Sequence, residues 1–401
     1  MVTYPSDWDE RSIGDFVHVG RGASPRPIEA FLTSGVDGVN WIKIGDAPRY
    51  GKYITQTAEK ITQSGAVRSV RVNAGDFILS NSMSFGRPYI LNIDGCIHDG
   101  WLRLYDYQDS VDKEFLYYLL SSEDTKKQYA TFAAGSGVQN LNKTVVKKVV
   151  VHLPPIPEQR RIARALSEMD DHIDNLAELI EKKKAIRDGA LEDLMSGRTR
   201  LTGFDKPWKE AELGRVGTFT KGAPLSKAHI SNSGTPFILY GELYTTYHEV
   251  TYKVFRHTEE SAADEHYSRI GDVIIPTSGE TAEEIATSCC VMVPGVILAG
   301  DLNIYRSSEF DGRFLSYVIN HVVNRQISEL AQGISIIHIN AKTLKGVTVR
   351  YPEIEEQTAI ADIIDTMDKD ITALEDERNK MIQIREGAMD DLLTGRVRLT
   401  A

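Results

Sequence analysis

Apolar side chains recur with a heptad period in two long segments of the chain. In the first segment they stand at Ile162, Leu166, Met169, Ile173, Leu176 and Ile180. In the second they stand at Ile360, Ile364, Met367, Ile371, Leu374 and Met381. Steps of four and three residues are typical of a coiled-coil seam. Prolines precede each segment and a glycine follows each, which predicts two helices of about 40 residues, or roughly 60 Å.

The two helical segments are copies of one sequence. They align without a gap at an offset of 198 residues, the distance from Gln159 to Gln357. The similarity continues more weakly upstream, where Asn142 matches Asn340. The chain therefore divides into variable segments 1–153 and 203–351 and repeated helices 154–202 and 352–401.

Equal halves of this kind predict an antiparallel helix pair with a pseudo-two-fold axis and a C-terminus close to Met1. The alternative is that each helix packs only on its own domain. Gly189 and Gly387 lie inside the helices at equivalent places. Because glycine in a helix costs about 1 kcal/mol relative to alanine, we expect another backbone to pack closely there.

The variable segments have the pattern of mixed α/β (α+β) domains. Short apolar runs separated by Gly, Asn, Asp and Ser predict strands. These runs cover residues 41–44, 76–79, 237–240 and 272–275. Helices are expected near Glu114–Tyr129 and Arg313–Leu330.

The amount and distribution of charge limit the possible binding partners. The 401 residues carry a formal net charge of -11, which argues against bulk attraction to nucleic acid or to an anionic membrane. That charge is uneven: 352–401 holds 6 basic and 13 acidic residues, whereas 1–153 holds 17 of each. A nucleic-acid site would therefore be local to the variable domains.

Familiar catalytic and metal-binding motifs are missing from the sequence. It contains no Walker A string, no H-E-x-x-H and no G-x-S-x-G. Cys96, Cys289 and Cys290 are too few for a disulfide framework or a zinc cluster, and we expect buried thiols. Neither a leader nor a membrane span is evident, so we expect a complete, soluble, cytoplasmic chain. Because the catalytic and metal-binding motifs are missing, we expect it to have no catalytic residue, metal or cofactor of its own.

Polar loops beside the predicted strands hold the candidate DNA-binding residues. Arg, Lys, Asn, Gln and Ser can contact base edges and phosphates, although such loops are more often simply solvated turns. The candidates in the first variable domain are Arg21, Ser24, Arg26, Lys43, Ser80, Asn81, Ser82, Ser84, Arg87, Gln139 and Asn140. Those in the second are Lys221, Ser226, Lys227, Thr277, Ser278, His338 and Asn340.

The repeated helices resemble those of the specificity subunits of type I restriction-modification systems. PPIPEQRRIA at 154–163 is similar to the opening of that family's conserved helices, and LMSGR at 194–198 to their close. Residues 41–46 and 240–242 resemble strands of its target-recognition domains. One departure is Pro352-Glu353, where the first copy has two prolines.

The resemblance implies a DNA-reading adaptor without catalysis of its own. Each recognition domain would read one half of a bipartite, asymmetric site in double-stranded DNA, and the helices would set the gap. Two methyltransferase subunits would dock on the heptad residues named above and supply S-adenosylmethionine, and motor-nuclease subunits would join them. ATP and magnesium are expected on these partners. The alternatives are a coiled-coil scaffold that binds no DNA and an enzyme with a dispersed site.

Overall fold

The computed structural model describes residues 3–48, 51–81, 86–107, 110–134, 141–331 and 337–399. The candidates Ser82, Ser84, Gln139 and Asn140 lie outside these ranges. The first compact unit comprises Met1–Leu179 with Leu374–Ala401, and the second comprises Ile180–Ala373. Each unit joins one variable domain to half of each long helix. The four segment boundaries expected from the sequence stay a prediction.

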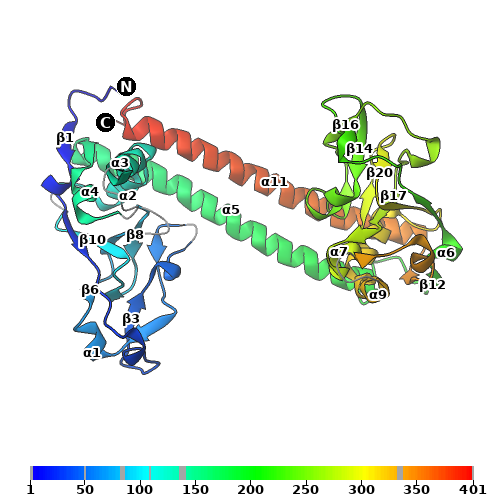
Figure 1. Cartoon of the computed structure of the whole chain (residues 1–401), viewed down its shortest axis with the longest axis horizontal. Helices are drawn as coiled ribbons and strands as arrows, with labels where there is room; N and C mark the ends of the chain where they lie inside the picture. Colours follow the sequence, from blue (N-terminus) through cyan, green and yellow to red (C-terminus); the bar gives the residue numbers. More distant parts are fainter. Residues whose placement is uncertain are drawn as a thin grey trace. The chain divides into compact units, whose positions relative to one another are not determined.

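The two long helices have the expected positions and lengths. Helix α5 (Ile156–Ser196) has 41 residues and α11 (Ile354–Leu393) has 40 (Figure 1). Gly197 and Gly395 follow them with φ of +72° and +70°, the left-handed conformation that ends many helices. Glycine adopts this conformation without the steric penalty of a Cβ atom.

Ion pairs show that the helices run antiparallel within each unit. In the first unit, α5 residue Asp170 lies 2.9 Å from Arg385, and Glu158 lies 2.7 Å from Arg398. In the second unit, Arg187 lies 2.8 Å from Asp368, and Arg200 lies 2.6 Å from Glu356. Within each unit, the residue number in or just after α11 falls as the residue number in or just after α5 rises. Each ion pair of the first unit recurs in the second at the 198-residue offset, with the two helices exchanged. The acidic residue moves from the first helix to the second and its arginine from the second to the first, the pattern expected of a pseudo-two-fold repeat.

Helix α11 does not pack only on the domain that precedes it. Its Leu392 and Leu393 are buried in the first unit with Phe115 of α2 and with Ile162 and Leu166 of α5. Arg398 also pairs with Asp7 at 2.8 Å, so the first and last described segments of the chain lie together, as expected. Met1 and Ala401 themselves lie outside the described residues. The alternative of helices packed only on their own domains is therefore wrong.

The first unit holds two small sheets and a strand pair. The larger sheet has the order β2-β10-β7-β8-β4, and only β4 and β8 in it are parallel. Its strands are β2 (His18–Arg21), β4 (Tyr53–Ile54), β7 (Phe77–Ser80), β8 (Pro88–Leu91) and β10 (Trp101–Tyr105). The smaller sheet, β5-β3-β9-β6, comprises β3 (Val39–Ile42), β5 (Glu59–Ile61), β6 (Val70–Val72) and β9 (Gly95–Ile97). Strand β1 (Asp9–Ser12) pairs with β11 (Val150–Leu153), which leads into α5.

The second unit repeats this plan. Its main sheet has the order β13-β21-β17-β19-β15, with strands β13 (Thr218–Lys221), β15 (Val250–Thr251), β17 (Asp272–Pro276), β19 (Cys289–Val291) and β21 (Leu302–Arg306). A second sheet contains β14 (Thr235–Leu239), β16 (Arg256–Thr258) and β20 (Ile297–Ala299). Two strand pairs join β12 (Lys209–Glu212) to β23 (Thr348–Tyr351) and β18 (Ser278–Gly279) to β22 (Ile337–His338). The mixed α/β fold and the four predicted strands are confirmed.

Each predicted domain helix is divided in two. The first is α2 (Lys113–Ser121) and α3 (Glu123–Ala134), because Ser122 is extended and its hydroxyl accepts a hydrogen bond from the Thr125 amide. The second is α8 (Gly312–His321) and α9 (Asn324–Leu330). The remaining helices are short: α1 (Gln63–Ala66), α4 (Lys143–Lys148), α6 (Leu213–Val216), α7 (Ala282–Ile285) and α10 (Ala341–Leu344).

The repeated glutamine at the start of each long helix joins that helix to its domain. The Gln159 side chain accepts a hydrogen bond from the Asp112 amide at 2.9 Å and donates one to the Pro154 carbonyl at 2.8 Å. Gln357 makes the same two bonds in the second unit, to the Asp311 amide and the Pro352 carbonyl. The bond to the domain is made by the backbone amide of the residue that caps α2 or α8. The shared motif therefore orients each domain on its helix.

The close backbone expected at Gly189 and Gly387 is absent. Apart from the backbone of its own helix and its chain neighbours, a Cβ atom at either position would meet no described atom within 4 Å, and both residues are exposed. We therefore predict that Gly189→Ala and Gly387→Ala each raise the free energy of unfolding by about 1 kcal/mol, because alanine has the higher helix propensity. Urea denaturation of the full chain measures the change, and a loss of stability in either variant would contradict it.

Candidate nucleic-acid interface

One cavity in the second unit brings together six of its seven predicted DNA-binding residues. Strand β21 is antiparallel to its neighbours β13 and β17, so the loops that follow β13 and β17 and the turn that precedes β21 meet at one edge of the sheet. The cavity has a volume of about 910 Å3. Its lining includes Lys221, Ser226, Lys227, Thr277, His338 and Asn340.

Close backbone packing shapes the wall of this cavity. A Cβ atom at Gly222 would lie 2.8 Å from the carbonyl oxygen of Gly300, and Gly300 has a φ of +77°. Both positions therefore require glycine. The next residue, Asp301, accepts a hydrogen bond from the Thr277 amide at 2.8 Å and one from the Ser278 hydroxyl at 3.1 Å. Ser278 thus holds the turn between β20 and β21.

In the first unit, four predicted residues converge on the equivalent turn. The Ser24 hydroxyl donates to the Asp99 carboxylate at 2.9 Å, and the Arg26 guanidinium donates to it at 3.3 Å. Arg21 and Asn81 donate to the Asp99 carbonyl at 3.1 and 3.0 Å. Sequence patterns did not reveal Asp99, because a single aspartate in a turn is a common residue.

The charge on Asp99 is favoured by its neighbours. Burial would raise the pKa of its carboxyl group, but the Ser24 hydrogen bond and the charges of His98, Arg26 and Arg21 lower it below its ordinary value. Asp99, Ser24, Arg26 and Lys43 line a cavity of about 690 Å3 in the first unit. The arginines and Asp99 thus form a charged cluster beside a hollow surface.

Three predicted residues are buried and hold loops rather than offering exposed side chains. Ser80 is fully buried, and Asn81 and Ser278 are each 6% exposed. The Ser80 hydroxyl accepts the Arg87 amide at 3.0 Å. Arg87 itself donates to the Gly51 carbonyl at 3.4 Å and lies over the Tyr89 ring.

The matching asparagines Asn142 and Asn340 both cap helices. The Asn142 side chain accepts a hydrogen bond from the Val145 amide, and Asn340 accepts one from the Thr343 amide, each at 3.0 Å. This bond satisfies an amide that the helix itself leaves free. It explains why the repeat extends to these residues.

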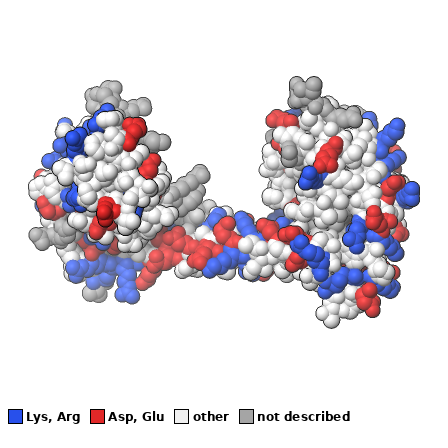
Figure 2. All heavy atoms as spheres, turned by 90° about the horizontal axis from the view of Figure 1, so that it is seen from below, with Lys and Arg blue, Asp and Glu red and all other residues white. Residues whose placement is uncertain are grey.

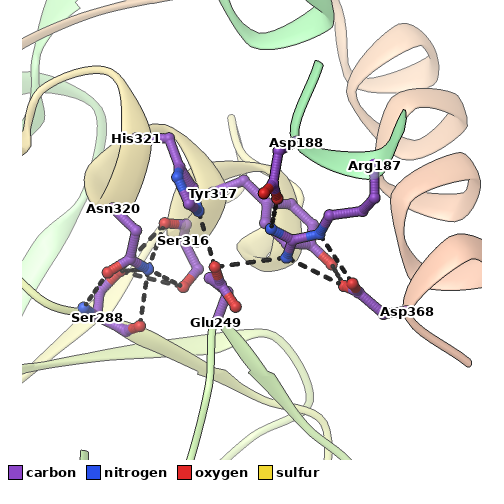
Figure 3. A network of polar contacts seen from close by, with 9 residues as sticks. All are labelled: Arg187, Asp188, Glu249, Ser288, Ser316, Tyr317, Asn320, His321 and Asp368. Carbon is purple, nitrogen blue, oxygen red and sulfur yellow. Dashed lines mark hydrogen bonds and ion pairs between the residues drawn. The ribbon is translucent and has the colours of Figure 1, made fainter. Parts of the chain in front are cut away.

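A partly buried polar network joins the second variable domain to both long helices (Figure 3). Glu249 lies 2.7 Å from His321 of α8 and 3.4 Å from Arg187 of α5. Arg187 also pairs with Asp368 of α11, which accepts a hydrogen bond from Tyr317 at 3.3 Å. In the first unit, Tyr118 and Arg385 meet Asp170 in the corresponding way.

We predict that protonation of Glu249 lowers the stability of the folded chain at acid pH. Burial would raise the pKa of this carboxyl group, but the His321 hydrogen bond and the Arg187 charge lower it to about 2, from 4.5. The folded state thus holds the proton more weakly than the unfolded state. This contribution, about 3 kcal/mol, is complete above about pH 4.5 and is lost as the pH falls toward 2.

Denaturant unfolding of wild type and Glu249→Gln between pH 6 and 3 measures this contribution. The gap in unfolding free energy between the two proteins should narrow as the pH falls. A gap that is independent of pH would contradict the assignment.

The heptad residues lie mainly inside the chain. Ile162, Leu166, Leu176, Ile180, Ile360, Ile364 and Ile371 are buried, and Met169, Ile173, Met367, Leu374 and Met381 are partly buried. The buried side chains serve packing within this chain and are not open to a partner. The face of the helices seen in Figure 2 presents acidic and basic side chains side by side.

Other chemistry in the described part of the chain is sparse. Cys96, Cys289 and Cys290 are buried free thiols, as predicted. Within the described ranges, no three His, Cys, Asp or Glu residues are placed to share a metal ion. No helix in those ranges combines the length and the apolar character that crossing a membrane requires.

Comparison with known proteins gives consistent matches along the chain. Residues 5–184 and 205–383 each match the family model described as type I restriction modification DNA specificity domain. The MjaVIII specificity subunit of a type I restriction enzyme from Methanocaldococcus jannaschii is 22% identical, with 98% of this chain and 94% of that protein covered. The putative MjaX specificity subunit of the same organism is 24% identical, with coverages of 98% and 95%.

A similar fold is found in solved structures. The crystal structure of a type I restriction-modification system S subunit from M. genitalium superimposes with a TM-score of 0.61 at 17% identity, covering 96% of each chain. The HsdS subunit from Thermoanaerobacter tengcongensis gives a TM-score of 0.50 at 16% identity, covering 98% of each chain.

Proposed function

Because this chain belongs to the family of type I restriction-modification specificity subunits, we propose that it recognises a bipartite, asymmetric sequence in double-stranded DNA. Each recognition domain reads one half-site. The main support is the convergence of six predicted residues on one cavity of the second unit. Specificity subunits are the non-catalytic members of these systems, so the chemistry belongs to partners.

The partners follow from the same proposal. Two methyltransferase subunits dock on the long helices and supply S-adenosylmethionine for methylation of an adenine in each half-site. Motor-nuclease subunits, which use ATP and magnesium, join them for cleavage. The helices hold the two recognition domains at a set distance, and this distance determines the unspecific gap between half-sites.

Mapping of methyladenine across the genome tests the proposal. Cells that contain this chain with its methyltransferase should show one bipartite motif that is absent without the chain. Exchanging residues 1–153 for the corresponding segment of another specificity subunit should change one half-site and leave the other half and the gap unchanged, because the second domain stays intact.

Two outcomes would contradict the proposed function. Methylation that is the same without this chain would remove its role in recognition and favour a scaffold that binds no DNA. A motif in which both half-sites change after the exchange would show that the domains do not read DNA separately. The unexchanged chain, expressed at the same level, is the control.

A further inference from the structure

A buried amide at the cavity of the second unit lacks a partner. Asn303 lies in β21, lines the cavity and is 1% exposed. Its side-chain nitrogen is buried and has no hydrogen-bond partner among the described residues. Leaving such a donor unsatisfied is unfavourable, so buried amides in folded proteins nearly always have a partner.

The equivalent position in the first unit shows that packing does not require an asparagine. Asn303 pairs with Lys221 across β21 and β13, and Leu102 pairs with Arg21 across β10 and β2 in the same register. Leu102 is also 1% exposed. The fold therefore accepts an apolar side chain at this point, and the amide of Asn303 serves another purpose.

The groups around the cavity match the parts of a nucleotide. Lys221 and Lys227 are exposed cations that suit a phosphate, and Tyr240 offers an aromatic ring for stacking. Asp301 offers an acceptor and Asn303 offers a donor, a combination that suits the edge of a base. A simple anion would use only the lysines.

We propose that this cavity receives one nucleotide, whose base accepts a hydrogen bond from the Asn303 amide. The inference rests on the proposed function and adds a specificity-determining residue to it. Because Asn303 is buried, a base within an intact duplex cannot reach it. The base comes from a nucleotide turned out of the second half-site, and the cavity contacts offset the cost of unstacking. A free nucleotide offers the same chemistry, and the test separates the two sources.

The test uses the assembled methyltransferase complex and duplexes with 2-aminopurine at each position of the second half-site in turn. Fluorescence should rise several-fold at the methylated adenine with both complexes, because the methyltransferase turns that base out itself, and at one further position with the wild-type complex but not with Asn303→Leu. Discrimination between bases at that position, measured by methylation rate, should fall about 10- to 100-fold in this variant. Its unfolding temperature should be unchanged or higher, because leucine fits the equivalent place.

Matched controls separate recognition from folding. Asn324→Leu makes the same chemical change at an exposed position of α9 and should alter neither readout. Titration calorimetry of the full chain with adenosine monophosphate tests whether the cavity binds a free nucleotide. Binding that Asn303→Leu abolishes, without a fluorescence rise at a further position on DNA, would assign the cavity to a free nucleotide.

The outcomes keep this inference distinct from the proposed function. If the wild-type complex methylates a bipartite motif but Asn303→Leu changes neither its specificity nor nucleotide binding, the cavity proposal is overturned and the proposed function stands. If no motif is methylated, the proposed function fails, and calorimetry still decides whether the cavity binds a nucleotide.

Discussion

Inserting one heptad into each long helix is expected to lengthen the gap between the two half-sites by about three base pairs. Seven helical residues add roughly 10 Å, and one base pair of B-DNA spans about 3.4 Å. The insertions belong after Leu179 in α5 and after Ala373 in α11, where the chain passes from one compact unit to the other. Matched insertions keep the heptad phase of both helices.

Methyladenine mapping measures the new gap. Both half-sites should stay the same, because neither recognition domain changes. The comparison variant carries the heptad in α5 alone, which leaves seven residues unpaired and should weaken methylation without defining a new gap. A motif with the original gap in the doubly extended chain would rule out the helices as the spacer.

Changing Ile186 and Ile384 together to aspartate is expected to abolish copurification with the methyltransferase. The two residues occupy equivalent places in the repeated helices and are 63% and 45% exposed. Apolar side chains exposed at matching sites suit two copies of one partner. A charge there would have to be buried unpaired in the interface, which is strongly unfavourable.

The experiment compares the double variant with Val36→Asp, which changes an exposed apolar residue of the first recognition domain. Copurification and methylation should be lost only in the helix variant, and thermal unfolding should stay near wild type in both. If the helix variant copurified with the methyltransferase as wild type does, the docking site would have to lie elsewhere on the chain. Each single substitution should lower the methyltransferase content of the complex to about one copy.

The sequence predicts most strongly what depends on local periodicity. The heptads from Ile162 and from Ile360 define both long helices, and the gapless repeat predicts their antiparallel pairing. The end of a helix was harder to predict where it depends on a single side-chain hydrogen bond. Ser122 divides an otherwise continuous helical pattern, because its hydroxyl competes for a backbone amide. At Gly189 and Gly387 the repeated glycine suggested a close neighbour that the structure does not contain.

The candidate site was only partly predictable. Thr277 follows the strand predicted at 272–275, so its position at a sheet edge could be expected, whereas Lys221 ends β13, a strand that was not predicted. Asp99 and Asn303 depend on pairing between strands distant in sequence: β10 pairs with β2, and β21 with β13. No short-range pattern carries that information. The burial of Ser80 and Asn81 likewise follows from the folded loop.

The ion pairs between the two repeats restrict sequence change in the long helices more than in the domain cavities. Arg398 of the second repeat meets Glu158 of the first, and Arg200 of the first repeat meets Glu356 of the second. Each helix therefore has to stay complementary to a copy of itself, which restrains drift in both. The cavities carry no such condition, since each is built within one domain. Under the proposed function, one half of the protein can thus acquire a new specificity while the other half and the helices stay unaltered.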